Sequence, residues 1–190
     1  MPKRNILLII GIAVISTVLI SINASKISAD DDSVSVEHGK YLVDIGNCNF
    51  CHTPKVMTET GMDIDLTKLL SGHQMNNDIT EHTASATNVD GEEVKANFHL
   101  TRWSGPWGIS FAANLTPDEK TGIGLWTEDM FIGTIRNGKH MGSGRDIQLP
   151  MPWKNLSHLT DNDLKSMFAY LQSVKPIKNK VPEQIASTKK

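Results

Sequence analysis

The pentapeptide Cys48-Asn49-Phe50-Cys51-His52 constrains this chain more than any other feature of its sequence. Two thiols three positions apart can each form a thioether with a vinyl group of one porphyrin, and the adjacent histidine is then held beside the iron. Cys-x-x-Cys-His is the attachment motif of c-type haem for this reason. The motif therefore predicts one covalent haem c, bound through Cys48 and Cys51, with His52 as the proximal ligand of the iron.

Other uses of the two cysteines fit the sequence less well. A structural zinc site needs four ligands, but the chain has no third cysteine, and His73, His82 and His99 are scattered along it. A disulfide within the motif would close too small a loop to stabilise the fold much. A thiol–disulfide oxidoreductase also uses Cys-x-x-Cys, and it remains the alternative from a different functional class. The segment before Cys48 does not, however, resemble the buried strand that precedes such a motif.

Length and charge exclude other classes of function. The 190 residues have room for one domain and an N-terminal extension, and the formal net charge is only −2. Because acidic and basic residues are near balance and no basic run is interleaved with aromatic residues, the sequence predicts no nucleic-acid partner.

The N-terminus predicts export. Lys3 and Arg4 precede an apolar run from Ile6 to Ile22, and positive residues stay on the cytoplasmic side of a membrane. The run is longer than a typical signal core, and no small-x-small cleavage pattern follows it. This favours an uncleaved single-pass anchor on the periplasmic side of the inner membrane, with a soluble periplasmic protein after signal cleavage as the alternative.

Two helices are predicted at the ends of the domain. The first begins at Ser35 or Val36 and ends at Gly46, and its interior Gly39 indicates close approach of another helix. The last begins after Thr160, with Asp163 in a capping-box-like position. Its apolar residues recur at helical spacing and form an amphipathic core stripe; they are Leu164, Met167, Phe168 and Leu171.

A third helix is predicted in the middle of the chain, over residues 128–137. Thr127 can cap its start, and Gly138 suits its end. Between the haem motif and this helix lies an insert of roughly sixty residues. The Asp90-Gly91 pair, flanked by residues 85–89 and 92–97, predicts a small β-hairpin there.

Together these motifs resemble the class I cytochromes c of bacteria, especially longer single-haem domains found alone or as cytochrome subunits of membrane and periplasmic oxidoreductases. The resemblance covers about residues 36–182 and implies a mostly α, class I cytochrome c fold. In that fold the N- and C-terminal helices pack over a covalent haem, here with a small β-hairpin insert. The segments that carry it are Gly39–Leu42, Cys48–Pro54, Asn114–Asp118, Gly122–Trp126, Pro150–Trp153 and Leu159–Asp161.

The resemblance also implies that a methionine from the loop before the last helix is the second axial ligand. Three candidates compete: Met151, Met141 and His140. Met151 lies between two prolines, which stiffen its loop, whereas Met141 lies in a mobile glycine-rich stretch. We therefore predict Met151 as the distal ligand.

Buried haem propionates need hydrogen-bond donors. Arg136 and the indole of Trp107 resemble such donors, against the alternatives of a surface ion pair and of core filling. The other histidines are expected in loops or at the surface; they include His73, His82, His99 and His158.

With His52 and Met151 both bound, iron has no open position for substrate, so the predicted function is outer-sphere one-electron transfer rather than catalysis. The partners are then redox proteins of a respiratory or periplasmic chain, with a membrane-bound complex foremost. The alternative is a dedicated cytochrome subunit of a larger membrane oxidoreductase. The predicted segments are 1–24, a membrane anchor or signal; 25–34, a polar linker; 35–182, the monohaem cytochrome domain; and 183–190, a flexible tail.

Overall fold

A computed structural model of the protein describes residues 33–75, 84–88 and 90–187. The chain divides into two compact units, 1–33 and 34–190, and every described helix and strand belongs to the second. The predicted anchor at 1–24 and nearly all of the predicted linker lie outside the described residues. Among the residues described, no helix is long and apolar enough to cross a membrane.

The three main helices begin where the sequence predicts, and the first and middle ones also end there. Ser35 caps α2 by accepting a hydrogen bond from the His38 amide. Thr127 caps α4 in the same way, and Thr160 and Asp163 form a complete capping box at α6. The helices are α2 (Val36–Ile45), α3 (Cys48–His52), α4 (Glu128–Asn137), α5 (Trp153–Leu156) and α6 (Asp161–Ser173), with single 3₁₀ turns η1 (Leu66–Lys68) and η2 (His140–Gly142).

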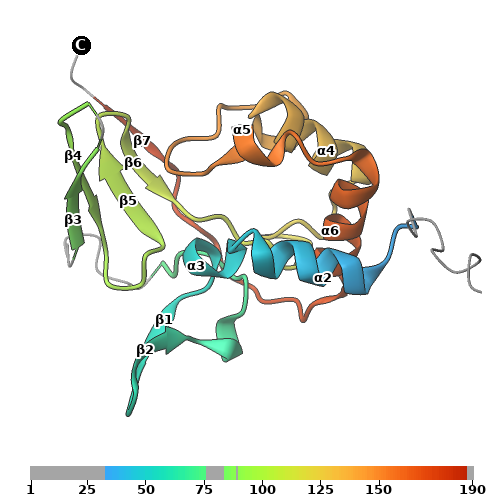
Figure 1. Ribbon diagram of the computed structural model, residues 1–190, viewed down its shortest axis with the longest axis horizontal. Helices are drawn as coiled ribbons and strands as arrows, with labels where there is room; N and C mark the ends of the chain where they lie inside the picture. The colour runs from blue at the N-terminus through green and yellow to red at the C-terminus, as the bar shows by residue number, and fades with distance from the viewer. Residues whose placement is uncertain (1–32, 76–83, 89, 188–190) are drawn as a thin grey trace, which may run out of the picture. The chain divides into compact units, whose positions relative to one another are not determined.

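Helices α2 and α6 cross with their backbones in close contact (Figure 1). A Cβ atom on Gly39 would lie 1.8 Å from the Ser166 carbonyl oxygen, so only glycine fits at this point. The close approach predicted from Gly39 is confirmed. His38 Nε2 lies 2.7 Å from Asp163 Oδ1 across the same crossing.

The hydrophobic core lies among α2, α4 and α6. The predicted stripe of α6 contributes to it, since Leu164, Met167 and Leu171 are buried, and the half-buried Phe168 packs against Phe131 of α4 with ring centroids 5.4 Å apart. The buried members of the core are Val43, Leu70, Ile123, Phe131, Ile135, Leu164, Met167, Tyr170 and Leu171.

Two antiparallel sheets complete the fold, and the larger lies beside the helices in Figure 1. The hairpin predicted at Asp90-Gly91 is confirmed, with Thr87 opposite Glu93 and Ala84 opposite Ala96. It forms only the first two strands of a larger sheet. The small sheet is β1 (Lys55–Thr58) with β2 (Gly61–Ile64); the large one has the order β3 (Ala84–Thr87), β4 (Glu93–Ala96), β5 (Arg102–Gly105), β6 (Gly108–Phe111) and β7 (Ile185–Ala186).

The expectation of a mostly α, class I cytochrome c fold with one small hairpin is therefore wrong. The described residues contain seven strands beside five α-helices. Most of these strands are four residues long, and β5 combines the buried Arg102 with half-buried Trp103, Ser104 and Gly105. Strands this short carry no clear alternation of apolar and polar residues, and the β6–β7 pair also joins segments far apart in the sequence.

The last described residues of the chain belong to the large sheet. Ile185 and Ala186, which the sequence places in a flexible tail, pair with Ile109 and Gly108 of β6. Gly108 has a φ of +105°, and a Cβ there would lie 2.0 Å from the Ile185 carbonyl oxygen. A glycine at this position therefore permits β7 to dock.

Replacing Gly39 with alanine tests the helix crossing. In an exposed helix this change stabilises by about 1 kcal/mol, but here the new Cβ would overlap the Ser166 carbonyl. We expect Gly39→Ala to lower the free energy of unfolding by about 1–3 kcal/mol, measured by urea denaturation. Glu37→Ala, at an exposed position of the same helix, is the control and should change it by less than about 0.5 kcal/mol. Equal stabilities of the two variants would contradict the crossing.

Candidate functional site

The haem-type motif forms a single tight turn, α3, directly after α2. Asn47 adopts a left-handed conformation (φ 56°), so the chain reverses between the two helices. The Phe50 amide then donates to the Asn47 carbonyl, and the Thr53 amide donates to the Asn49 carbonyl. Positions three apart lie on the same side of such a turn, so Cys48 and Cys51 share one face.

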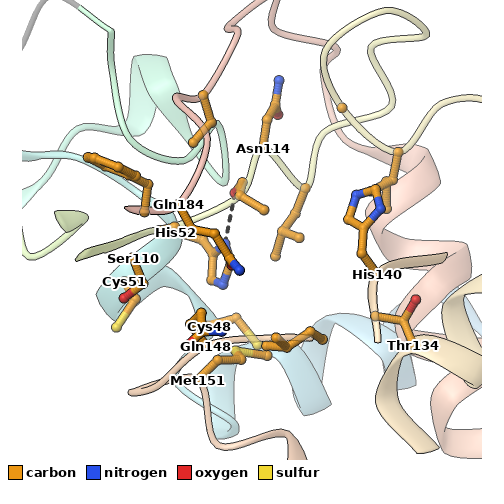
Figure 2. Close-up of a pocket in the computed structure, with 18 of the residues that line it drawn as sticks. Cys48, Cys51, His52, Ser110, Asn114, Thr134, His140, Gln148, Met151 and Gln184 are labelled. Carbon is orange, nitrogen blue, oxygen red and sulfur yellow. Dashed lines mark hydrogen bonds between the residues drawn. The ribbon is translucent and has the colours of Figure 1, made fainter. Parts of the chain in front are cut away.

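That face lines a cavity of about 460 Å³, within the range of cofactor sites. Figure 2 shows Cys48, Cys51, His52, Met151 and His140 around it. Its walls are mostly apolar and come from all parts of the domain. They include residues 110–115, 120–123, 147–148, 150–152 and 180–184, together with Trp103, Trp126, Phe131, Thr134, Ile135, Arg145, Leu156, Met167 and Leu171.

His52 is buried and held in one orientation (Figure 2). Its Nδ1 lies 2.8 Å from the Ala113 carbonyl oxygen, which can only accept, so Nδ1 carries the proton and donates. Burial lowers the pKa of His52, which keeps the ring neutral. The Nε2 atom is then the nitrogen available to a metal, the arrangement typical of metal-binding histidines.

Both cysteines are free thiols. Burial raises the pKa of Cys48 to about 11 and also raises the pKa of Cys51. Reactive cysteines of thiol oxidoreductases have lowered pKa values instead, so this environment disfavours thiol–disulfide exchange. Over the described part of the chain, no group of three or more histidine, cysteine, aspartate or glutamate side chains is placed to hold a metal.

Two of the three candidates for the second axial ligand line the cavity. Met151 does so from the segment that enters α5, and His140 does so from η2, where its ring meets Trp126 edge-on at 5.1 Å. Met141 is 42% exposed and lies outside the described lining. Met151 and His140 are therefore the two candidates for the second axial ligand that the position of the cavity supports.

Arg136 and Trp107 have other partners and do not lie in the described wall of the cavity. The Arg136 guanidinium donates to the Ser157 carbonyl and to Asp161, which ties α4 to the start of α6. These partners are 21 and 25 residues away along the chain, so no local pattern reveals them. The Trp107 indole donates to Ser110 Oγ at 3.3 Å. The assignment of both residues to propionates stays a prediction.

Sequence reasoning missed the cationic groups that do line the cavity, Lys120, Arg145 and Lys180. Arg145 donates to Gln184 Oε1 at 2.8 Å. The glycines around Arg145 could have marked it as part of a functional loop. Nothing near Lys180 in the sequence shows that the segment after α6 returns to the site.

Buried asparagines hold that returning segment in place. Asn114 Nδ2 donates to the Ile177 carbonyl at 2.8 Å. Asn179 Nδ2 donates to the carbonyls of Ser71 and His73, at 2.7 and 2.9 Å. Residues 177–184 are therefore fixed against the same segments that support His52.

His73 lies in a loop, as the sequence predicts, but its side chain is buried rather than at the surface. Its Nδ1 lies 2.9 Å from Thr101 Oγ1, and its ring packs on Phe111 at 4.9 Å. It thus joins the segment after η1 to strand β6 and the residue before β5.

No family model matches the chain. It is 25% identical over 174 residues to the cytochrome c subunit of the quinone alcohol dehydrogenase of Gluconobacter oxydans, a match that covers 90% of this chain and 28% of that protein. It is 35% identical over 89 residues to the fructose dehydrogenase cytochrome subunit of Gluconobacter japonicus, covering 46% of this chain and 18% of that one. It is 27% identical over 159 residues to the gluconate 2-dehydrogenase cytochrome c subunit of Pantoea cypripedii, covering 80% of this chain and 29% of that protein.

The chain thus spans less than a third of the length of these relatives. All three are cytochrome subunits of dehydrogenases, and this similarity supports a c-type cytochrome that takes part in electron transport.

Proposed function

We propose that this protein is a dedicated cytochrome subunit of a dehydrogenase complex and transfers electrons through one covalent haem c. The observation that carries the proposal is that Cys48, Cys51, His52 and Met151 all line one cavity. The similarity to dehydrogenase subunits favours this role over a free, membrane-tethered electron carrier. Export to the periplasm, with residues 1–24 as anchor or signal, belongs to the same proposal.

The donor set of the cavity fits a haem. Covalent attachment needs two free thiols, and axial ligation needs a neutral imidazole and a thioether. The cavity offers all of these groups, and the Nδ1 of the imidazole already makes a hydrogen bond. When bound, the haem supplies an iron that accepts and returns one electron. The residues that would hold it are Cys48 and Cys51 by thioether bonds, His52 through Nε2, and Met151 through its sulfur.

The rest of the chain determines what this site can do. The hydrogen bond to Ala113 keeps His52 in one tautomer, and the apolar walls from Ile123, Phe131 and Leu171 exclude water. Held by both His52 and Met151, the iron would have no open position for a substrate, and the chemistry it would supply is the transfer of one electron to a partner. Arg145, Lys120 and Lys180 line the cavity, so we propose them as partners of the propionates in addition to Arg136 and Trp107, whose assignment stays a prediction.

Covalent attachment is the first test. Because thioethers survive denaturation while axial ligand bonds do not, we expect haem to stay with the wild-type chain during acid–acetone extraction. The Cys48→Ser, Cys51→Ser double variant should lose it. The measurement is the visible spectrum of the extracted polypeptide. A wild-type protein with two free thiols and no Soret band would refute the proposal.

The distal ligand is tested with matched methionine variants. Met151→Ala should abolish the weak sulfur-to-iron charge-transfer band of the oxidised protein, lower the reduction potential and let carbon monoxide bind. Met141→Ala should do none of these, because Met141 is exposed. If Met151→Ala keeps the band and excludes carbon monoxide, Met151 is not the ligand.

Partnership with a dehydrogenase is tested by affinity purification of the full chain from detergent-treated cells that produce it naturally. We expect a dehydrogenase to co-purify in fixed ratio, and the substrate of that enzyme to reduce the haem. A tag-only purification is the control. Recovery of the haem protein alone from both membrane and soluble fractions would instead favour a free carrier.

A further inference from the structure

Lys55, the first residue of β1, is buried although lysine is almost always exposed. It is 5% exposed, and its ammonium donates to the carbonyls of Thr53 and Phe50 at 2.5 and 2.8 Å. The Asn49 carbonyl lies 3.4 Å away, and the Phe50 ring centroid lies 5.8 Å away. All of these groups belong to the turn that carries the haem motif or directly follow it.

Within the described residues, no carboxylate is placed to cancel the charge of this ammonium. Among the ion pairs of the described residues, none involves Lys55. The carbonyl oxygens satisfy its donors but carry only partial charges. Lys55 does not itself line the cavity; its positive charge lies against the backbone of the turn that carries the haem motif, where it has lost most of its hydration.

The ammonium of Lys55 lies next to the residues that would hold the haem. It donates to the carbonyls of Phe50 and Thr53, and Cys51 and His52 stand between these two residues in the chain. The charge is therefore held beside the part of the motif that is nearest the proposed iron.

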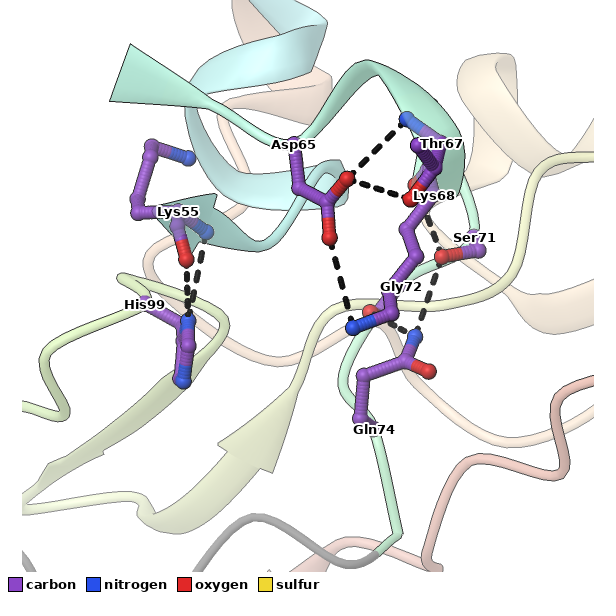
Figure 3. A network of polar contacts seen from close by, with 8 residues as sticks. All are labelled: Lys55, Asp65, Thr67, Lys68, Ser71, Gly72, Gln74 and His99. Carbon is purple, nitrogen blue, oxygen red and sulfur yellow. Dashed lines mark hydrogen bonds and ion pairs between the residues drawn. The ribbon is translucent and has the colours of Figure 1, made fainter. Parts of the chain in front are cut away.

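The backbone fixes this charge in place (Figure 3). The amide nitrogen and the carbonyl oxygen of Lys55 lie 3.2 and 2.9 Å from His99 Nδ1. The Asp65 amide donates to the Pro54 carbonyl, and Asp65 in turn closes the adjacent turn through Thr67. Hydrogen bonds hold the backbone at Lys55 and at the preceding Pro54, so the fold sets the distance between Lys55 and the motif.

We propose that Lys55 is a fixed positive charge that raises the reduction potential of the haem. Fe(II) carries one positive charge less than Fe(III), so a nearby ammonium favours the reduced state. The inference rests on the proposed haem site, and it assigns to β1 and its hairpin a role in setting the potential of that site.

The test compares neutral and charge-retaining variants of the full haem-bearing chain. Lys55→Gln keeps amide donors for the carbonyls but removes the charge. At fixed ambient potential we expect it to lower the Fe(II)/Fe(III) ratio about tenfold, which is 59 mV for a one-electron couple. Lys55→Arg should stay within about twofold of the wild type because it keeps the charge. Lys68→Gln is the matched control, since Lys68 is exposed in the neighbouring turn and its charge is screened.

Spectroelectrochemical titration measures these ratios, and carbon monoxide binding reports whether the iron has been opened. A lowered ratio in Lys55→Gln, with the iron closed and the Lys55→Arg and Lys68→Gln ratios near the wild type, supports the inference. Equal ratios in Lys55→Gln and the wild type overturn it. So does a variant that binds carbon monoxide, because Lys55 would then act on structure rather than on charge.

Lys55→Met, which keeps the apolar stem, is the second neutral variant should Lys55→Gln fail to hold haem. If neither neutral variant holds haem, Lys55 serves attachment and the inference is wrong. Absence of covalent haem from the wild-type protein would refute the proposed function itself, whereas wild-type haem with an unchanged variant potential would refute this inference alone.

Discussion

The hydrogen bond from His52 to the Ala113 carbonyl is the contact on which the site depends. It joins the haem motif to the segment that follows β6, which lies 61 residues further along the chain. In the same segment, the Ala112 carbonyl accepts a hydrogen bond from the His73 amide, and the Leu115 amide donates one to the Leu70 carbonyl. Residues 112–116 are therefore the backbone around which the motif, the insert and the end of the chain are assembled.

This assembly explains why so many polar groups are buried near an apolar cavity. Asn114 accepts from the amide and hydroxyl of Thr116 and donates to the carbonyls of Ile177 and Asn179. Each buried amide group has partners, so its burial adds rigidity without the large penalty of an unsatisfied group. A rigid wall suits electron transfer, because little then needs to move when the charge of the iron changes.

Local signals in the sequence predicted the three main helices and one hairpin, but not the rest of the large sheet. A cap marks a helix start because it satisfies backbone groups within three residues, and the caps are Ser35, Thr127 and Thr160. Strand β7 has only two residues and pairs with β6 from the far end of the domain, so no local pattern marks it. Because strands of this kind were missed, the predicted fold class was wrong. The same limit applies to the site. The haem motif is contiguous, whereas Lys180 reaches the cavity only because Asn179 holds the segment before it.

The cavity and the buried lysine together indicate how the reduction potential of such a subunit would be adjusted to that of its enzyme. In the proposed site, His52 and Met151 would leave the iron no position at which to bind a substrate, so the potential would be the property left for the protein to adjust. Ligand identity fixes this potential coarsely, because a thioether raises it by a large step. Lys55 acts through distance and charge alone, and it lies outside the ligand set. A change at this position can therefore tune the driving force from a dehydrogenase without rebuilding the site that holds the haem.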